Sequence, residues 1–208
     1  MKSFLRLFVL ITSVVSASSG AAATAHADTA IFAGGCFWCM QPAFDHLREE
    51  THGQGVQSTV VGYTGGHKDK PNYEEVSGGQ TGHREAIEVK FDPAKVPYSR
   101  LLDIFWANVD PTDAHGQFCD KGEQYTSAIF YQNEEQKKLA LASAERVKTQ
   151  LKVAEPIVTA ILPAKSFYAA EDYHQGYSRK NPVRYRFYRF NCGRDQRLKS
   201  VWGKASGH

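Results

Sequence analysis

The sequence predicts a mixed fold, an α/β or α+β sandwich. Short apolar runs of strand length alternate along the chain with longer segments of helical periodicity. Long Gly-rich loops join them, and such loops often carry function. The 208 residues, 42% apolar and 23% charged, are typical of one folded domain with a sizeable core. A formal net charge of +3 is too small to indicate a nucleic-acid partner.

Residues 1–27 are predicted to be a signal peptide. Lys2 and Arg6 precede an apolar run over residues 7–15, which is too short to span a bilayer, and small residues then lead to Ala25-His26-Ala27. Cleavage after Ala27 leaves residues 28–208, with a net charge of +1. We expect this part to be a single domain that is exported, either periplasmic or secreted.

The first predicted elements are a strand and a helix separated by two glycines. The strand covers residues 30–33 and ends at Gly34-Gly35, and the helix runs from Cys36 to about Arg48. Its apolar residues recur at intervals of three and four, at Phe37, Met40, Phe44 and Leu47. Cys36 therefore lies at or just before a helix N-terminus.

The remaining elements follow from the same criteria. Strands are predicted over residues 56–63, 85–91, 125–131 and 157–162. One helix ends at Asp110-Pro111, and a second is capped by Asn133 and extends to about residue 151. Few helix signals follow Asn181-Pro182, which predicts an extended C-terminal tail.

Cys36 is the strongest candidate for chemistry. The helix dipole and unpaired N–H groups favour a thiolate at a helix N-terminus, so we expect the pKa of Cys36 to fall. The preceding glycines leave the sulfur accessible, and Phe37 and Trp38 place an apolar surface beside it. This arrangement suits a substrate with a methyl group next to the attacked atom. A buried, unreactive cysteine is the alternative.

Two polar loops offer acids and phenols. The first begins at Tyr73 and leads to Glu85, and it lacks the pattern of a phosphate-binding loop. A carboxyl beside aromatic side chains resists ionisation and can donate a proton near neutral pH, whereas a solvated Glu85 is the more common alternative. The second loop contains Asp120 and Tyr125.

Seven motifs follow one another in the order and with the intervals of one family. They lie at residues 34–38, 61–66, 71–73, 81–86, 110–112, 124–129 and 170–175. Over about residues 31–182 the chain therefore resembles the peptide methionine sulfoxide reductase A family. The resemblance implies a two-layer α/β (α+β) sandwich with a ferredoxin-like core. It also implies thiol-dependent reduction of methionine S-sulfoxide, free or in proteins, as a repair of oxidised proteins.

The resemblance also assigns roles to seven residues. The nucleophile of the family matches Cys36, and its general acid matches Glu85. Its polar helpers match Tyr73, Asp120 and Tyr125, and its methyl pocket matches Phe37 and Trp38. A sulfoxide sulfur is a poor electrophile until its oxygen is protonated, so an acid must accompany the thiol. The product is a sulfenic acid, which a second thiol converts to a disulfide. A thioredoxin-like dithiol then reduces this disulfide, and no cofactor or metal is required.

The resolving cysteine is expected to be Cys192, because a mobile tail can reach the site after methionine leaves. Cys39 is the alternative, since it follows Cys36 by three residues, and Cys119 is a third candidate. Cys39 stands where the family frequently has Gly, and Gln41 where it often has Glu.

Other classes of function remain as alternatives. A thioredoxin-like thiol-disulfide oxidoreductase would use Cys36 and Cys39 as its redox pair. Cys36 and Cys39 could supply two ligands of a zinc site, but the sequence offers no second pair of ligands, so no metal site is predicted. Residues 179–204 contain nine Lys or Arg, one acidic residue and several aromatics. They indicate either a surface for anions or a basic tail packed on the domain. We expect no nucleic-acid partner and a monomer.

Overall fold

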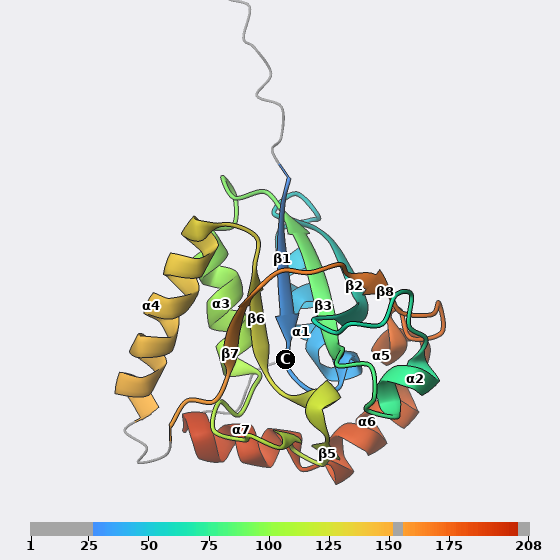
Figure 1. The fold of residues 1–208 in the computed structure, drawn as a ribbon. Coiled ribbons are helices and arrows are strands. Elements are labelled where there is room, and N and C mark those ends of the chain that lie inside the picture. Colours follow the sequence, from blue (N-terminus) through green and yellow to red (C-terminus); the bar gives the residue numbers. More distant parts are fainter. Residues whose placement is uncertain (1–26, 152–155, 204–208) are drawn as a thin grey trace, which may run out of the picture.

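The computed structural model describes residues 27–151 and 156–203, and a six-stranded mixed sheet lies at its centre (Figure 1). The strand order is β7-β6-β1-β3-β2-β8, and neighbours are antiparallel except for the parallel pair β6 and β7. The strands are β1 (Asp28–Ala33), β2 (Val56–Thr64), β3 (Arg84–Phe91), β6 (Ala128–Tyr131), β7 (Ala160–Pro163) and β8 (Tyr168–Ala169). The predicted mixture of strands and helices is confirmed.

Three long helices form a layer against one face of this sheet. They are α1 (Phe37–Glu50), α3 (Tyr98–Ala107) and α4 (Glu134–Leu151). Phe32 of β1 lies at the centre of the interface, where its ring stacks on Phe44 at 5.4 Å and on Phe105 at 5.3 Å between centroids. Burial of these aromatic side chains, together with the aliphatic residues around them, stabilises this layer.

The opposite face of the sheet carries a smaller apolar cluster. Side chains alternate along a strand, so Ile31 and Ala33 point away from Phe32 and pack with Phe130. Ala164 and Phe167, between β7 and β8, cover this cluster. Figure 1 shows that segment crossing the front of the sheet. With both faces covered, β1 is buried along most of its length.

Shorter elements surround the end of β1. They are α2 (Tyr73–Ser77), β4 (Gly116–Gln117), β5 (Asp120–Lys121), the 3₁₀-helix η1 (Glu123–Tyr125) and α5 (Tyr177–Lys180). The strand predicted to begin at Tyr125 begins instead at Ala128. Gly122 has a φ of 130° and allows a tight turn, in which the N–H of Tyr125 donates to the carbonyl of Gly122 at 3.1 Å.

The expected extended C-terminal tail is wrong, because residues 182–202 form two helices, α6 (Pro182–Asn191) and α7 (Arg194–Trp202). Pro182 suits the first turn of α6, and Gly193 adopts a φ of 67° between the helices. The side chains of Arg194 and Leu198 are buried and hold α7 on the domain.

The predicted signal peptide lies outside the described residues apart from Ala27. Within residues 27–151 and 156–203, every helix is too short or too polar to cross a membrane.

Candidate active site

The turn from β1 into α1 places Cys36 at the N-terminus of the helix, as predicted. Gly35 has a φ of 78°, and a Cβ at this position would lie 2.5 Å from the Cβ of Gln117. Only glycine therefore fits this turn. Cys36 is the N-cap of α1, and its carbonyl accepts a hydrogen bond from the N–H of Cys39 at 3.0 Å. Arg194 supports the turn by donating to the carbonyl of Gly34 at 3.3 Å.

Cys36 and Cys39 are free, and a hydrogen bond joins their sulfurs. Burial raises the pKa of Cys36 well above its usual value, and the bond to Cys39 adds to this effect. The same bond lowers the pKa of Cys39 to about 7 despite burial, assisted by the charges of Arg194 and Arg189. The hydrogen bond thus favours ionisation of Cys39 over ionisation of Cys36.

The expected fall in the pKa of Cys36 is therefore wrong for this state. Only 7% of Cys36 is exposed, so the cost of burying a thiolate outweighs the helix dipole. The nucleophile needs a partner that removes its proton when substrate binds.

Glu85 lies beside the first turn of α1. Its Oε2 accepts a hydrogen bond from the N–H of Phe37 at 3.0 Å, and the residue is 3% exposed. Burial raises the pKa of Glu85 to about 8, the Phe37 hydrogen bond opposes the rise, and the charge of Asp120 adds to it. Glu85 is consequently protonated at neutral pH and able to donate a proton. The alternative of a solvated carboxylate is excluded.

Tyr73, Tyr125 and Asp120 belong to the same cluster. Burial and then the charge of Glu85 raise the pKa of both phenols, so both stay protonated. The pKa of Tyr125 also responds to Tyr73, Asp120 and Cys36, which places all of these groups around one site. Burial raises the pKa of Asp120 as well. The structure thus brings together the five residues that the sequence proposed for catalysis.

The two aromatic residues after Cys36 occupy different positions. Phe37 is 1% exposed and packs against Tyr63 in a small buried cluster. Trp38 is half-buried, and its ring stacks on Tyr177 with a centroid distance of 3.7 Å. Trp38 therefore forms the accessible part of the apolar wall, and Phe37 supports it from inside.

His174 is a site residue that the sequence analysis did not single out. Its Nδ1 accepts a hydrogen bond from Nε1 of Trp38 at 2.9 Å, and its ring lies 5.0 Å from Phe37 and 4.5 Å from Tyr73. Burial lowers the pKa of His174, so the ring is neutral and can accept this bond. The motif at residues 170–175 marked the segment, but nothing local indicated its contact with Trp38.

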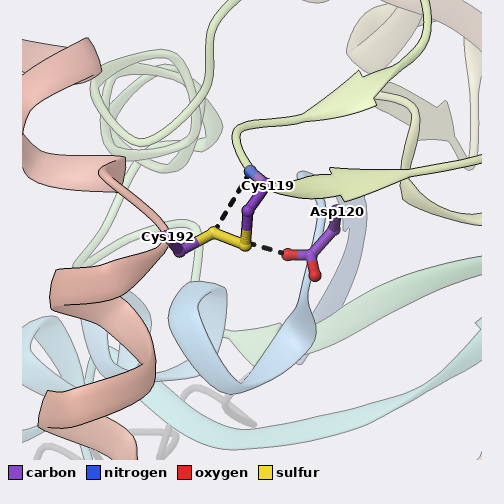
Figure 2. A group of neighbouring side chains, drawn as sticks. All are labelled: Cys119, Asp120 and Cys192. Atoms are coloured by element: carbon purple, nitrogen blue, oxygen red, sulfur yellow. Dashed lines mark hydrogen bonds between the residues drawn. A yellow bond between two sulfur atoms is a disulfide. The ribbon is translucent and has the colours of Figure 1, made fainter.

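A disulfide bond between Cys119 and Cys192 joins the β4–β5 turn to the end of α6. Figure 2 shows the carboxylate of Asp120 pointing toward it, with Oδ2 3.9 Å from Sγ of Cys192. Within the described part of the chain, Cys119, Asp120 and Cys192 are a group whose ligand atoms lie close enough for a metal ion. Their two sulfurs are bonded to each other, however, and a bonded sulfur is not a thiolate ligand.

The aromatic side chains of α6 point in two directions. Tyr185 and Tyr188 are half-buried, and the hydroxyl of Tyr188 donates to Oδ2 of Asp120. Phe187 and Phe190 are 72% and 78% exposed. The interpretation of a basic tail with aromatics packed on the domain is therefore correct for the tyrosines and wrong for the phenylalanines.

Comparisons with known proteins decide the family. A family model described as "Peptide methionine sulfoxide reductase" matches residues 28–206. The chain belongs to this family. A Bacillus subtilis relative named peptide methionine sulfoxide reductase MsrA is 49% identical over 176 residues, which is 85% of this chain and 96% of the relative. A relative of the same name from Streptococcus agalactiae is 49% identical over 76% of this chain and 90% of its own length.

Solved structures are similar to this chain as well. The structure of methionine sulfoxide reductase A of Corynebacterium diphtheriae matches with a TM-score of 0.67 and 35% identity, and the match covers 77% of this chain and 78% of the other. The reduced form of Mxr1 from Saccharomyces cerevisiae matches with a TM-score of 0.66 and 32% identity, and the match covers 76% of this chain and 87% of the other. The chain is thus an enzyme for thiol-dependent reduction of methionine sulfoxide. The comparisons do not favour the thioredoxin-like alternative.

Proposed function

We propose that Cys36 is the nucleophile and Glu85 the general acid in the reduction of methionine S-sulfoxide. Glu85 protonates the sulfoxide oxygen, and Tyr73 and Tyr125 donate hydrogen bonds to it. The sulfur of Cys36 attacks the sulfoxide sulfur, and the oxygen passes to Cys36. Methionine leaves, and Cys36 becomes a sulfenic acid. The observation that carries this assignment is the buried Glu85, protonated at neutral pH beside the Cys36 helix turn.

The methyl group of the substrate is proposed to lie against Trp38, with Phe37 behind it. The stacking of Trp38 on Tyr177 and its hydrogen bond to His174 fix the indole plane, which supports this role. A fixed apolar wall on one side and proton donors on the other distinguish the two faces of a sulfoxide. This asymmetry supports selectivity for one epimer, and membership of the family makes the S epimer the expected one.

A single-turnover assay tests the nucleophile. Reduced enzyme, freed of reductant, is mixed with each sulfoxide epimer separately, and methionine is counted per enzyme. The S epimer should give a burst that Cys36→Ser abolishes. A burst of wild-type size in Cys36→Ser, or equal bursts from both epimers, would remove the assignment.

The resolving step has two candidates. Cys39 is the free thiol in contact with Cys36, and its lowered pKa supports attack on the sulfenic acid with release of water. Cys192, the candidate preferred from sequence, is bonded to Cys119. We propose that Cys39 resolves in the state described, and that Cys192 can do so only after its own disulfide has been reduced.

Peptide mapping distinguishes these two routes. Enzyme with the Cys119–Cys192 disulfide intact receives one equivalent of methionine sulfoxide and is digested without reduction. A bridge between Cys36 and Cys39 is expected. A bridge between Cys36 and Cys192 from the intact-disulfide enzyme would contradict the proposal.

We further propose that the sheet has a ferredoxin-like core and that the chain acts outside the cytoplasm as a monomer. The order β6-β1-β3-β2, with α1 and α3 connecting strands, supports the core. The sequence of residues 1–27 supports export, and the mature protein should begin at Asp28 by mass spectrometry of the exported fraction. Sedimentation equilibrium measures the oligomeric state.

The reductant is proposed to be a thioredoxin-like dithiol. Cys119 is exposed, and a cavity of about 540 Å³ lies beside Cys192, lined also by Phe118 and Arg197. These features support access of an external thiol to the Cys119–Cys192 disulfide, whose reduction is the step that frees Cys192.

A further inference from the structure

Helix α6 presents a stripe of apolar side chains to solvent. Val183, Phe187 and Phe190 are spaced by four and three residues, so they lie on one face of the helix. Val183 is 71% exposed, and the three are the most exposed large apolar side chains of residues 27–151 and 156–203. Tyr188 faces the domain instead, where its ring packs edge-on against Trp38 with centroids 5.9 Å apart. The stripe is therefore left without a partner in the fold.

Two exposed arginines, Arg184 and Arg186, border this stripe. One directly follows the first residue of the stripe and the other directly precedes the second, so they lie on opposite sides of it, because successive residues point about 100° apart around a helix. The third arginine of α6, Arg189, is turned inward and paired with Asp195. Asp195 is the only acidic residue in positions 173–208, so α6 carries no carboxylate that offsets the two outer charges.

We propose that the outer face of α6 binds the surface of an anionic lipid membrane. The apolar stripe enters the boundary between the headgroups and the acyl chains, and Arg184 and Arg186 contact lipid phosphates on either side of it. Figure 1 shows α6 and α7 along the lower edge of the molecule, where α6 can lie flat on a surface.

The size and the charge of this face favour a membrane over a protein partner. One valine and two phenylalanines expose on the order of 400 Å². Each partner in a stable protein interface buries about 800 Å², so the stripe is only half as large as that. A second copy of this chain would bring arginines against arginines, which repel. A bilayer needs no matching groove, and it supplies both an apolar interior and anionic phosphates.

The face is also preformed. Cys192 at the end of α6 is bonded to Cys119, and the hydroxyl of Tyr188 donates to Asp120, so the helix is fixed to the domain from its inner side. Binding therefore costs none of the conformational entropy that a disordered basic tail would lose. Because α6 is about 10 Å across, docking holds Trp38 within roughly one helix diameter of the membrane. The reductase would then act on proteins at a lipid surface.

Co-sedimentation with lipid vesicles tests this face. The chain without residues 1–27, whose apolar run would itself bind lipid, keeps all of the family domain over residues 28–206. It is mixed with vesicles of phosphatidylcholine alone, or of phosphatidylcholine and phosphatidylglycerol in equal parts, at low and at high salt. Binding is expected to the anionic vesicles alone and should weaken as salt rises.

Variants of α6 separate the two contributions. Phe187→Ser and Phe190→Ser should each lower the partition coefficient roughly 10-fold, because each removes a large apolar side chain from the boundary region. Arg184→Gln combined with Arg186→Gln should lower it roughly 30-fold at low salt, from the attraction of two cations to an anionic surface.

Matched controls come from the exposed side of α4. Leu141→Ser removes an apolar side chain that is 50% exposed, and Lys138→Gln combined with Lys148→Gln removes two exposed charges. These variants should bind anionic vesicles nearly as the wild type does. The single-turnover methionine burst is measured for every variant and shows that each one is folded, so the result is independent of the proposed reductase mechanism.

Three outcomes would overturn the proposal: no binding to anionic vesicles, equal binding to phosphatidylcholine alone, or α6 variants that bind like the wild type. Sedimentation equilibrium without lipid tests the rival occupant. A dimer that Phe187→Ser abolishes would assign the stripe to a second copy of the chain and contradict membrane binding.

Discussion

Replacing Glu85 with glutamine should stabilise the protein at alkaline pH while it removes the proton donor. The amide oxygen of Gln can still accept the Phe37 N–H, so the variant imitates the protonated carboxyl. Glu85 has a pKa of about 8 in the fold against an ordinary value of 4.5. At about 1.4 kcal/mol per pH unit, burial of the ionised form corresponds to roughly 5 kcal/mol of stability.

The direction in which stability changes with pH follows from proton binding. Between pH 4.5 and 8 the folded state holds the Glu85 proton and the unfolded state does not, so the contribution of Glu85 to stability is complete below pH 4.5 and is lost as pH rises to 8. Glu85→Gln lacks this loss. The stability of the variant minus that of the wild type should therefore grow by several kcal/mol over this range.

Urea unfolding at half-unit pH steps measures this difference, and contributions of groups that do not interact with Glu85 cancel between the two proteins. Glu88→Gln, on the same strand, controls for removal of a carboxylate from β3. A Glu85→Gln difference that stays constant from pH 4.5 to 8.5 would refute the reasoning, because the carboxyl would then ionise in the fold as readily as in water.

Two other results are expected. Glu85→Gln should slow the single-turnover burst roughly 10²- to 10⁴-fold, the usual effect of a lost general acid. The rate of the wild-type burst should fall above pH 8 as Glu85 ionises. Equal rates of the variant and the wild type at all pH values would exclude this role. Cys119→Ser should lower the free energy of unfolding by about 2–4 kcal/mol, because the bond closes a loop between cysteines 73 positions apart. Urea unfolding measures this change, and wild type unfolded in dithiothreitol should match the variant; a variant as stable as the oxidised wild type would speak against it.

Local sequence patterns were sufficient for the part of the site that lies on β1, α1 and β3. Two glycines before Cys36 indicated the turn, the apolar spacing indicated the helix, and the alternation after Glu85 indicated the strand. The charge states were harder to predict. The helix-dipole argument for Cys36 was local, whereas its pKa depends mainly on burial among residues from other elements.

Contacts from the C-terminal region could not be predicted in this way. Arg194 contacts Gly34 across 160 positions and Tyr188 contacts Asp120 across 68, and neither separation leaves a periodic pattern. The tail was expected to be extended because few helix signals follow Asn181-Pro182. It is helical because two inward-facing tyrosines and one buried arginine anchor it, and a buried arginine is rare enough that composition does not suggest it.

The contact between Arg194 and Gly34 has a consequence for biosynthesis. A ribosome makes the chain from its N-terminus, so Cys36 and Cys39 emerge long before the residues that surround them. Until α7 has been made, these thiols lack the guanidinium that holds their turn and favours the Cys39 thiolate. A product that stops before Arg194 keeps every residue of the six-stranded sheet but has an unfinished reactive centre. We therefore expect activity to require synthesis of α7 as well as of the sheet.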